Sequence, residues 1–95
     1  MPTWERTARF DRDWDPLSAD ERLRFRRVAH VFVADLRSGQ LRAGLRVKRV
    51  EGTEAVFGLT WAPDGRATFR YGAGGTADPH VIWRRVGRHD ILRRP

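Results

Sequence analysis

The spacing of the apolar residues changes once along the chain, near Gly44, and this change restricts the possible fold more than any other sequence feature. From Ala19 to Arg37 the spacing is three and four positions, as on one face of an α-helix, at Phe25, Val28, Ala29, Phe32 and Leu36. Beyond Gly44 apolar and polar residues alternate, as they do in β-strands. The sequence therefore predicts an α+β fold in which a helix precedes a sheet.

The predicted helix has a signal at each end. Ser18-Ala-Asp-Glu21 has the form of a capping box, in which the serine hydroxyl accepts the Glu21 amide and the Glu21 carboxylate accepts the Ser18 amide. Ser38 and Gly39 are typical of a C-terminal stop. The cations on the polar face of this helix are nearly balanced by nearby acids, so we interpret that face as solvated rather than as a binding ridge.

Two shorter elements are predicted before this helix. Residues 10–17 have apolar residues at helical spacing, and Pro16 ends any helix at that point. Trp4 to Arg9 has the composition of a short first strand. The N-terminal part is therefore expected to be a short strand followed by a helical hairpin.

The second half of the chain has four alternating runs. The runs are Leu45 to Val50, Val56 to Trp61, Arg66 to Tyr71 and Val81 to Val86. The second and third are joined by Ala-Pro63-Asp-Gly65, which predicts a tight hairpin. A glycine-rich connection from Gly72 to Pro79 lacks the Gly-Lys-Ser/Thr of a phosphate-binding loop, so we interpret it as a mobile linker. Together the runs predict a curved, mainly antiparallel sheet of four to five strands.

Alternation also predicts what each face of the sheet carries. Ala67, Phe69 and Tyr71 share one face, which the helix is expected to cover. The reverse face is expected to collect basic residues, namely Arg46, Lys48, Arg66, Arg70 and, according to register, Arg84 or Arg85. This basic face is the predicted site.

Length and composition limit the class of protein. With 95 residues and a mass of 11.0 kDa, the chain has room for a single hydrophobic core, so residues 1–95 are expected to form one domain. No cysteine is present, which excludes disulfides and thiolate metal sites. Neither a membrane-spanning run nor a secretory signal is visible, so a cytoplasmic location is expected.

The positive charge is concentrated in the second half. Of the formal charge of +7, residues 1–37 contribute +1, from 8 cations and 7 anions, and residues 38–95 contribute +6, from 11 cations and 5 anions. All cations except Lys48 are arginines, whose planar guanidinium groups bind phosphate bidentately and stack on bases. This distribution favours a polyanionic partner, with RNA as the first candidate.

The order of elements resembles that of the RelE/ParE toxin superfamily. The segments that carry the resemblance are LRVKRVEGTEAVFGLTWAPDGRATFRYG and HVIWRRVGRHDIL. The resemblance implies a RelE-like fold and a toxin of a type II toxin-antitoxin module. It also implies cleavage of mRNA, often on the ribosome, and neutralisation by a cognate antitoxin protein.

The resemblance extends to individual residues. Arg66 looks like the family's strand arginine that contacts the scissile phosphate, and His89 falls where some ribonuclease members place a histidine. Two departures stand beside these matches. The run Val56 to Trp61 lacks the catalytic lysine that several relatives have there, and the chain ends at Pro95 without their terminal tyrosine.

Cleavage of RNA by attack of the 2′-hydroxyl needs a base, an acid and cations around the phosphorane, and histidine can act as acid or base near neutrality. The predicted catalytic residues are Arg66, His89, Lys48 and Arg70. The predicted RNA-binding residues are Arg46, Arg49, Arg84, Arg85, Arg88, His80 and Tyr71. His30 lies within the predicted helix and is interpreted as structural, and Asp90 is an alternative to His89 as the base. No metal site or cofactor is expected, because no pair of histidines has metal-ligand spacing.

Two other functions remain open on the same sequence. One is a ParE-like toxin that inhibits DNA gyrase and needs no catalytic acid or base. The other is a non-catalytic RNA-binding module that uses the basic face alone. If an antitoxin exists, we expect it to cover the basic face, because that blocks a polyanionic substrate directly.

Overall fold

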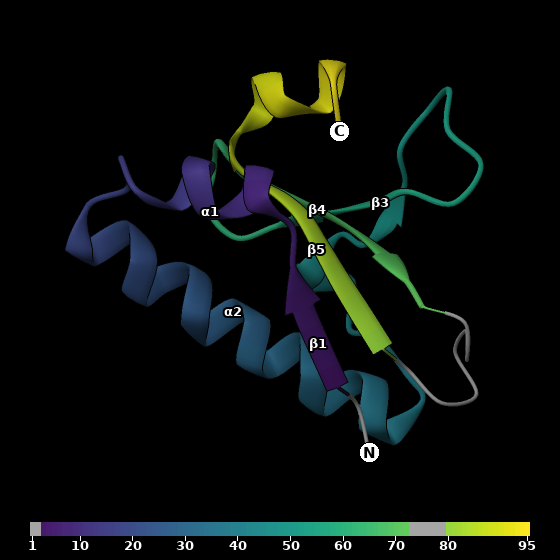
Figure 1. Cartoon of the computed structure of the whole chain (residues 1–95). Helices are drawn as coiled ribbons and strands as arrows, with labels where there is room; N and C mark the ends of the chain where they lie inside the picture. Colours follow the sequence, from purple (N-terminus) through teal and green to yellow (C-terminus); the bar gives the residue numbers. More distant parts are fainter. Residues whose placement is uncertain (1–2, 73–79) are drawn as a thin grey trace.

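The computed structural model describes residues 3–72 and 80–95. Its elements, in chain order, are β1 (Thr3–Arg6), α1 (Ala8–Trp14), α2 (Ala19–Ser38), the 3₁₀ turn η1 (Ala43–Leu45), β2 (Lys48–Arg49), β3 (Phe57–Thr60), β4 (Gly65–Tyr71), β5 (His80–Arg88) and the 3₁₀ segment η2 (His89–Arg93). The strands form one five-stranded sheet in the order β1-β5-β4-β3-β2 (Figure 1). The parallel pair is β1 with β5, and the other neighbours are antiparallel. The α+β fold and the predicted sheet are confirmed.

Helix α2 begins and ends where the sequence predicts. Ser18 Oγ accepts from the Glu21 amide at 3.1 Å, and Glu21 Oε1 accepts from the Ser18 amide at 2.9 Å. The hydrogen bond from the Ser18 amide lowers the pKa of Glu21. Gly39 ends the helix in the left-handed conformation, with a φ of 82° that favours glycine. Among the described residues, no helix is long and apolar enough to cross a membrane.

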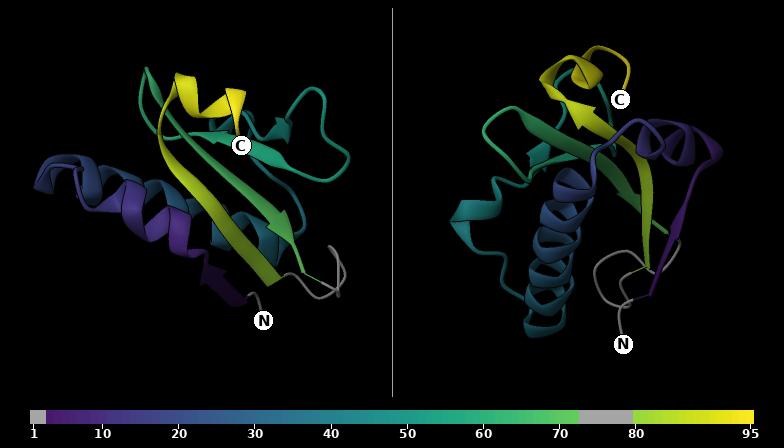
Figure 2. Two further views of the ribbon diagram at one scale, coloured as in Figure 1. Left: turned by 45° about the horizontal axis from the view of Figure 1, so that its top comes forward. Right: turned by 90° about the vertical axis from the view of Figure 1, so that its left-hand side faces the viewer.

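The core lies between α2 and one face of the sheet. Phe25 packs edge-on against Trp83, with ring centroids 5.3 Å apart, and Phe32 packs against Phe69 at 4.8 Å. Phe32 and Phe69 are fully buried. The predicted apolar face of the sheet is therefore confirmed, and α2 crosses it (Figure 2).

The reverse face of the sheet is partly covered by the C-terminal segment, which the sequence did not predict. Figure 2 shows η2 returning over the ends of β4 and β5, on the side away from α2. Glycines in β3 and β5 leave room for it: Leu92 lies over Gly58 and Ile91 lies over Gly87. Thr68 lies on this reverse face, because it alternates with Ala67 and Phe69, and it is fully buried. The single basic face predicted from alternation is wrong in this central part.

Several predicted boundaries also differ. The predicted strand Leu45 to Val50 is reduced to β2, because its first residue belongs to η1 and Arg46 has a φ of 50° that no strand allows. The predicted first strand ends at Arg6 instead of Arg9, and α1 starts two residues before the predicted helix. Apart from Gly72, the predicted mobile linker Gly72 to Pro79 lies outside the described residues.

Candidate functional site

A groove on the reverse face of the sheet brings together five of the predicted site residues. It encloses about 1140 Å³ and lies between η1, β2 and β3 on one side and the start of η2 on the other. The predicted residues that line it are Arg46, Lys48, Arg49, Arg66 and His89. We call this the basic groove. Four cations on one groove can neutralise successive phosphates of a nucleic-acid strand.

Arg66 is positioned by the β3–β4 hairpin. Gly65 is required at this turn, because a Cβ there would lie 2.6 Å from the Trp61 ring. Trp61 is buried in the core and donates its indole N–H to the Arg66 carbonyl at 2.9 Å. The Arg66 side chain is also fixed, because its Nη1 donates to three carbonyls of the turn, at Gly65 (2.9 Å), Ala62 (3.3 Å) and Pro63 (3.3 Å).

The Arg66 guanidinium can still bind a ligand through the N–H groups that the turn does not use. In the described parts of the chain, the side-chain hydrogen bonds of Arg66 all use Nη1, which leaves Nε and Nη2 for an anion. A guanidinium binds phosphate through two parallel N–H groups, so this edge suits a phosphate oxygen pair. The hairpin therefore presents a preorganised cation on the wall of the basic groove.

The opposite wall carries the other three cations. Arg46 ends η1 in the left-handed conformation, which is uncommon outside glycine and turns the chain sharply into β2. Lys48 and Arg49 follow and are exposed, and Arg49 donates to the Thr53 carbonyl. The segment before η1 is linked to the end of α2 by a bidentate ion pair between Arg42 and Asp35. The hydrogen bonds from Arg42 lower the pKa of Asp35.

The groove also contains a histidine and a carboxylate. His89, the first residue of η2, is exposed on its lining. Glu51, in the turn after β2, lines the same groove. Sequence reasoning missed Glu51, because a single carboxylate in a Glu-Gly turn belongs to no motif. Its spacing of three residues from Lys48 is the one signal that could have placed it near the basic residues.

Arg85 forms a half-buried ion pair that links β5 to α1. Its Nε and Nη2 donate to the two carboxylate oxygens of Asp13, each at 2.9 Å, and both side chains are 17% exposed. Asp13 raises the pKa of Arg85 through these bonds. Arg85 also donates to the Arg94 carbonyl, and Arg84 donates to the Pro95 carbonyl at 3.1 Å. Arg84 and Arg85 therefore both contact the C-terminal segment, and their binding to RNA stays a prediction.

Replacing Asp13 with alanine is expected to lower the free energy of unfolding by roughly 2–3 kcal/mol, because it leaves a mostly buried guanidinium unpaired. Urea unfolding followed by circular dichroism measures the loss. The double variant Asp13→Ala, Arg85→Met is the control, and it should recover part of the loss. A single variant as stable as the parent would contradict this structural assignment.

Four other predicted residues lie outside the groove lining. Tyr71 packs against Phe57 and Phe69 on the α2 face, and burial raises its pKa, so its observed contacts are with the core and its binding to RNA stays a prediction. His80 lies at the junction of β5 with β1, where Nδ1 is 2.6 Å from the Thr3 hydroxyl. Arg70 is exposed on β4, beyond the groove.

Arg88 is the fourth of these residues. Its side chain is 71% exposed and lies 3.8 Å from both Glu21 and Asp64. Within residues 3–72 and 80–95, no three histidine or acidic side chains come together as a metal site would require.

Comparison with solved structures shows what this fold resembles. A YafQ mutant from E. coli superposes with a TM-score of 0.70 at 13% identity, over 97% of this chain and 98% of that chain. YafQ in the E. coli DinJ–YafQ toxin-antitoxin complex gives 0.67 at 16% identity, over 96% of both chains. The RelB–RelE antitoxin-toxin complex from Methanococcus jannaschii gives 0.62 at 14% identity, over 93% of both chains.

These matches establish the fold. The chain has the RelE-like toxin fold over almost its whole length, as the sequence resemblance implied. No protein-family model matches the sequence, and no curated protein matches it significantly.

Proposed function

We propose that this chain, which has the fold of the RelE and YafQ toxins, is the toxin of a type II toxin-antitoxin module and cleaves mRNA in its basic groove. The observation that carries the proposal is the convergence of Arg66, His89 and Glu51 on one groove whose other wall is lined by cations. Structural neighbours that are toxins in complex with antitoxins support the toxin class and a cognate antitoxin partner.

The groups of the groove match the steps of RNA cleavage. Arg46, Lys48 and Arg49 hold the phosphates on either side of the scissile bond. Glu51 takes the proton of the 2′-hydroxyl, whose oxygen attacks the phosphorus. His89 gives a proton to the 5′-oxygen as its bond to phosphorus breaks. The products are a 2′,3′-cyclic phosphate and a 5′-hydroxyl, and no metal ion is needed for either proton transfer.

Arg66 supplies the electrostatic part of the reaction. Negative charge develops on the non-bridging oxygens in the pentavalent transition state, and a cation held in place before the reaction stabilises that charge without reorganisation. The three turn carbonyls that hold Nη1 fix the guanidinium in this way. This role fits Arg66 better than the flexible Lys48.

The groove favours a nuclease over the two alternative functions. A gyrase inhibitor needs no acid or base beside its cations, and a simple RNA-binding module needs none either. The basic groove has both a histidine and a carboxylate. An assay of purified protein on mRNA, on free and ribosome-bound templates, tests the proposal, and arrest of gyrase with intact RNA would support the ParE-like alternative instead.

Binding of single-stranded RNA is expected to weaken steeply with salt. Four groove cations that each neutralise a phosphate give a slope of log K against log salt of about −3, at about −0.7 per phosphate. Replacing Lys48 with alanine should make the slope less negative by about 0.7. Fluorescence anisotropy between about 50 and 200 mM salt measures it. Arg27→Ala, on the exposed face of α2, is the charge-matched control, and a flat response of the parent protein would exclude the groove as the contact surface.

A further inference from the structure

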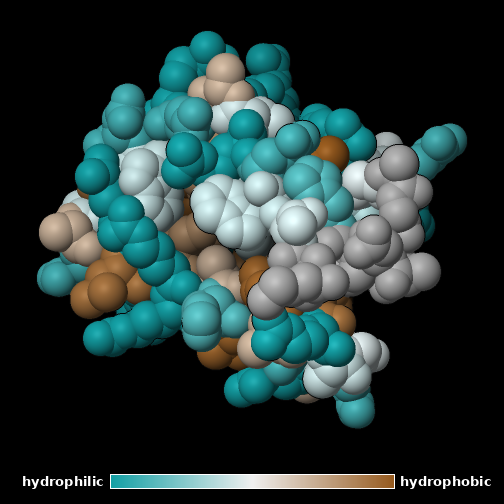
Figure 3. Space-filling model, turned by 60° about the horizontal axis from the view of Figure 1, so that its bottom comes forward, coloured by the Kyte–Doolittle hydropathy of each residue, from teal (hydrophilic) through white to brown (hydrophobic). Residues whose placement is uncertain are grey.

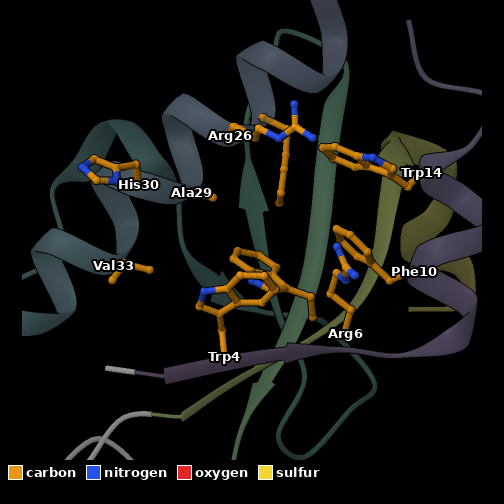
Figure 4. A pocket seen from close by; sticks show the side chains of 10 residues that line it. Trp4, Arg6, Phe10, Trp14, Arg26, Ala29, His30 and Val33 are labelled. Carbon is orange, nitrogen blue, oxygen red and sulfur yellow. The ribbon is translucent and has the colours of Figure 1, made fainter. Parts of the chain in front are cut away.

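A second hollow lies on the other side of the molecule, between β1, α1 and α2. It encloses about 350 Å³, and its lining shares no residue with the basic groove. We call it the aromatic pocket. Figure 4 shows side chains from the strand and both helices pointing toward one space, with Trp4 and Arg6 below it and Arg26 above it.

Trp4 is the unusual member of this pocket. Its side chain belongs to β1, where alternation places Trp4 and Arg6 on the α2 side and directs Thr3 toward His80 on the other. It is 56% exposed, although tryptophan is normally largely buried. The space-filling view of the lower side of Figure 1 shows pale and brown side chains at the surface among teal hydrophilic ones (Figure 3). A large exposed aromatic side chain beside a hollow is typical of an interaction site.

The floor of the pocket is apolar and closely packed. Phe10, Phe25 and Trp83 are buried and contact one another, with ring centroids 5.3–6.3 Å apart. Ala29 and Val33 of α2 complete the apolar lining. A nucleobase has polar edges that such a floor leaves unpaired, and burying them unpaired is costly, whereas an apolar side chain has no such need. The floor therefore favours a polypeptide over a nucleic acid.

The rim of the pocket is cationic. The Arg26 guanidinium lies 5.2 Å from the centroid of Trp14, and the Arg6 guanidinium lies 5.8 Å from that of Trp4. Asp11 partly neutralises Arg6, at 3.1 Å. Arg26 forms no ion pair with a carboxylate within residues 3–72 and 80–95. Because the rim is positive and the floor apolar, the complementary ligand has an apolar side chain beside carboxylates.

We propose that the aromatic pocket is a docking site for the antitoxin and that it receives an apolar side chain flanked by acidic residues. The proposal rests on the proposed function, because a toxin of this class has a protein inhibitor. It adds a contact on the face opposite the basic groove, so the inhibitor is held at two separate surfaces. Occupation of the aromatic pocket alone then leaves the basic groove open to RNA.

The test uses a labelled peptide in which a central leucine is flanked by glutamates, with the ¹⁵N-labelled full chain. We expect the peptide to shift the indole N–H signals of Trp4 and Trp14 and to leave the imidazole signals of His89 in place. A peptide with alanine at the centre, or with lysines in place of the glutamates, should bind with an affinity at least about tenfold lower. Equal binding of all three peptides would overturn the proposal.

Two pairs of variants make the test specific. Trp4→Ala and Arg26→Glu should each weaken peptide binding about tenfold or more, because an aromatic side chain that the ligand covers and a complementary charge carry much of such an interface. Leu23→Ala is the control for Trp4, since Leu23 is also an exposed apolar residue, at 46%, outside the pocket. Arg24→Glu is the charge control on the same helix. Equal losses in pocket and control variants would overturn the assignment.

A titration with single-stranded RNA separates this site from the proposed function. RNA should shift the signals of His89 and leave the Trp4 indole unchanged. An RNA-induced shift of Trp4 would assign the pocket to nucleic acid and overturn the peptide proposal. If the protein cleaves RNA but does not bind the peptide, only the docking proposal is refuted. If it binds the peptide but does not cleave RNA, only the proposed nuclease activity is refuted.

Discussion

Replacing His89 with alanine is expected to slow RNA cleavage by roughly 10²- to 10⁴-fold, the usual loss when a positioned acid or base is removed. RNA affinity should stay nearly unchanged, because the four groove cations that hold the strand are intact. Single-turnover cleavage of a defined RNA measures the rate, and fluorescence anisotropy measures the affinity.

The control for this variant is His30→Ala. His30 is exposed on α2, far from the basic groove, and its replacement should leave the cleavage rate unchanged. Circular dichroism must show that both variants are folded. A folded His89→Ala protein that cleaves at the parent rate would contradict the assignment, and Glu51, Lys48 and Asp90 would then be the groups to test for proton transfer.

Replacing Arg66 with alanine is expected to slow the chemical step by roughly a hundredfold or more, which corresponds to about 3 kcal/mol of lost transition-state stabilisation. Affinity should fall only modestly, since Arg46, Lys48 and Arg49 still bind the strand. Lysine should not restore the rate, because a single ammonium cannot bond the turn carbonyls and present two parallel donors to a phosphate.

The matched control is Arg70→Ala, four residues further along β4 and outside the groove lining. We expect it to retain close to the parent rate. Because Arg66 also bonds the turn, its variant needs a check of thermal stability. Equal losses of rate in the Arg66 and Arg70 variants would contradict a specific role for Arg66 and indicate that total charge alone matters.

The elements that the sequence predicts best are those with local signals. The capping box at Ser18, the glycine stop of α2 and the Pro-Asp-Gly turn each act through neighbouring residues, and each forms where predicted. β2 was overestimated, since alternation cannot reveal that Arg46 adopts a positive φ. The register of β5 against β4 could not be predicted from the sequence either, because an irregularity between Thr68 and Phe69 shifts the pairing of the two strands.

The candidate site was predicted only in part, because some of its residues follow from the strand pattern and others depend on contacts between distant parts of the chain. Arg66 and Lys48 line one groove, from the strands on either side of β3, because strand order and alternation place them on one face. His89 lines the same groove because β5 ends beside the hairpin. The role of Arg85 depends on Asp13, which is 72 residues away in the sequence, so no local pattern could have assigned it. Glu51 was missed because only the folded turn brings it to the groove.

The most direct test of the central claim is cleavage of an RNA oligonucleotide by the purified protein in the presence of EDTA, with and without ribosomes. We expect cleavage, with a 2′,3′-cyclic phosphate on one product and a 5′-hydroxyl on the other. A 2′-deoxy substitution at the scissile nucleotide should abolish cleavage. Intact RNA in every condition, or cleavage of the deoxy-substituted strand at the same position, would contradict it.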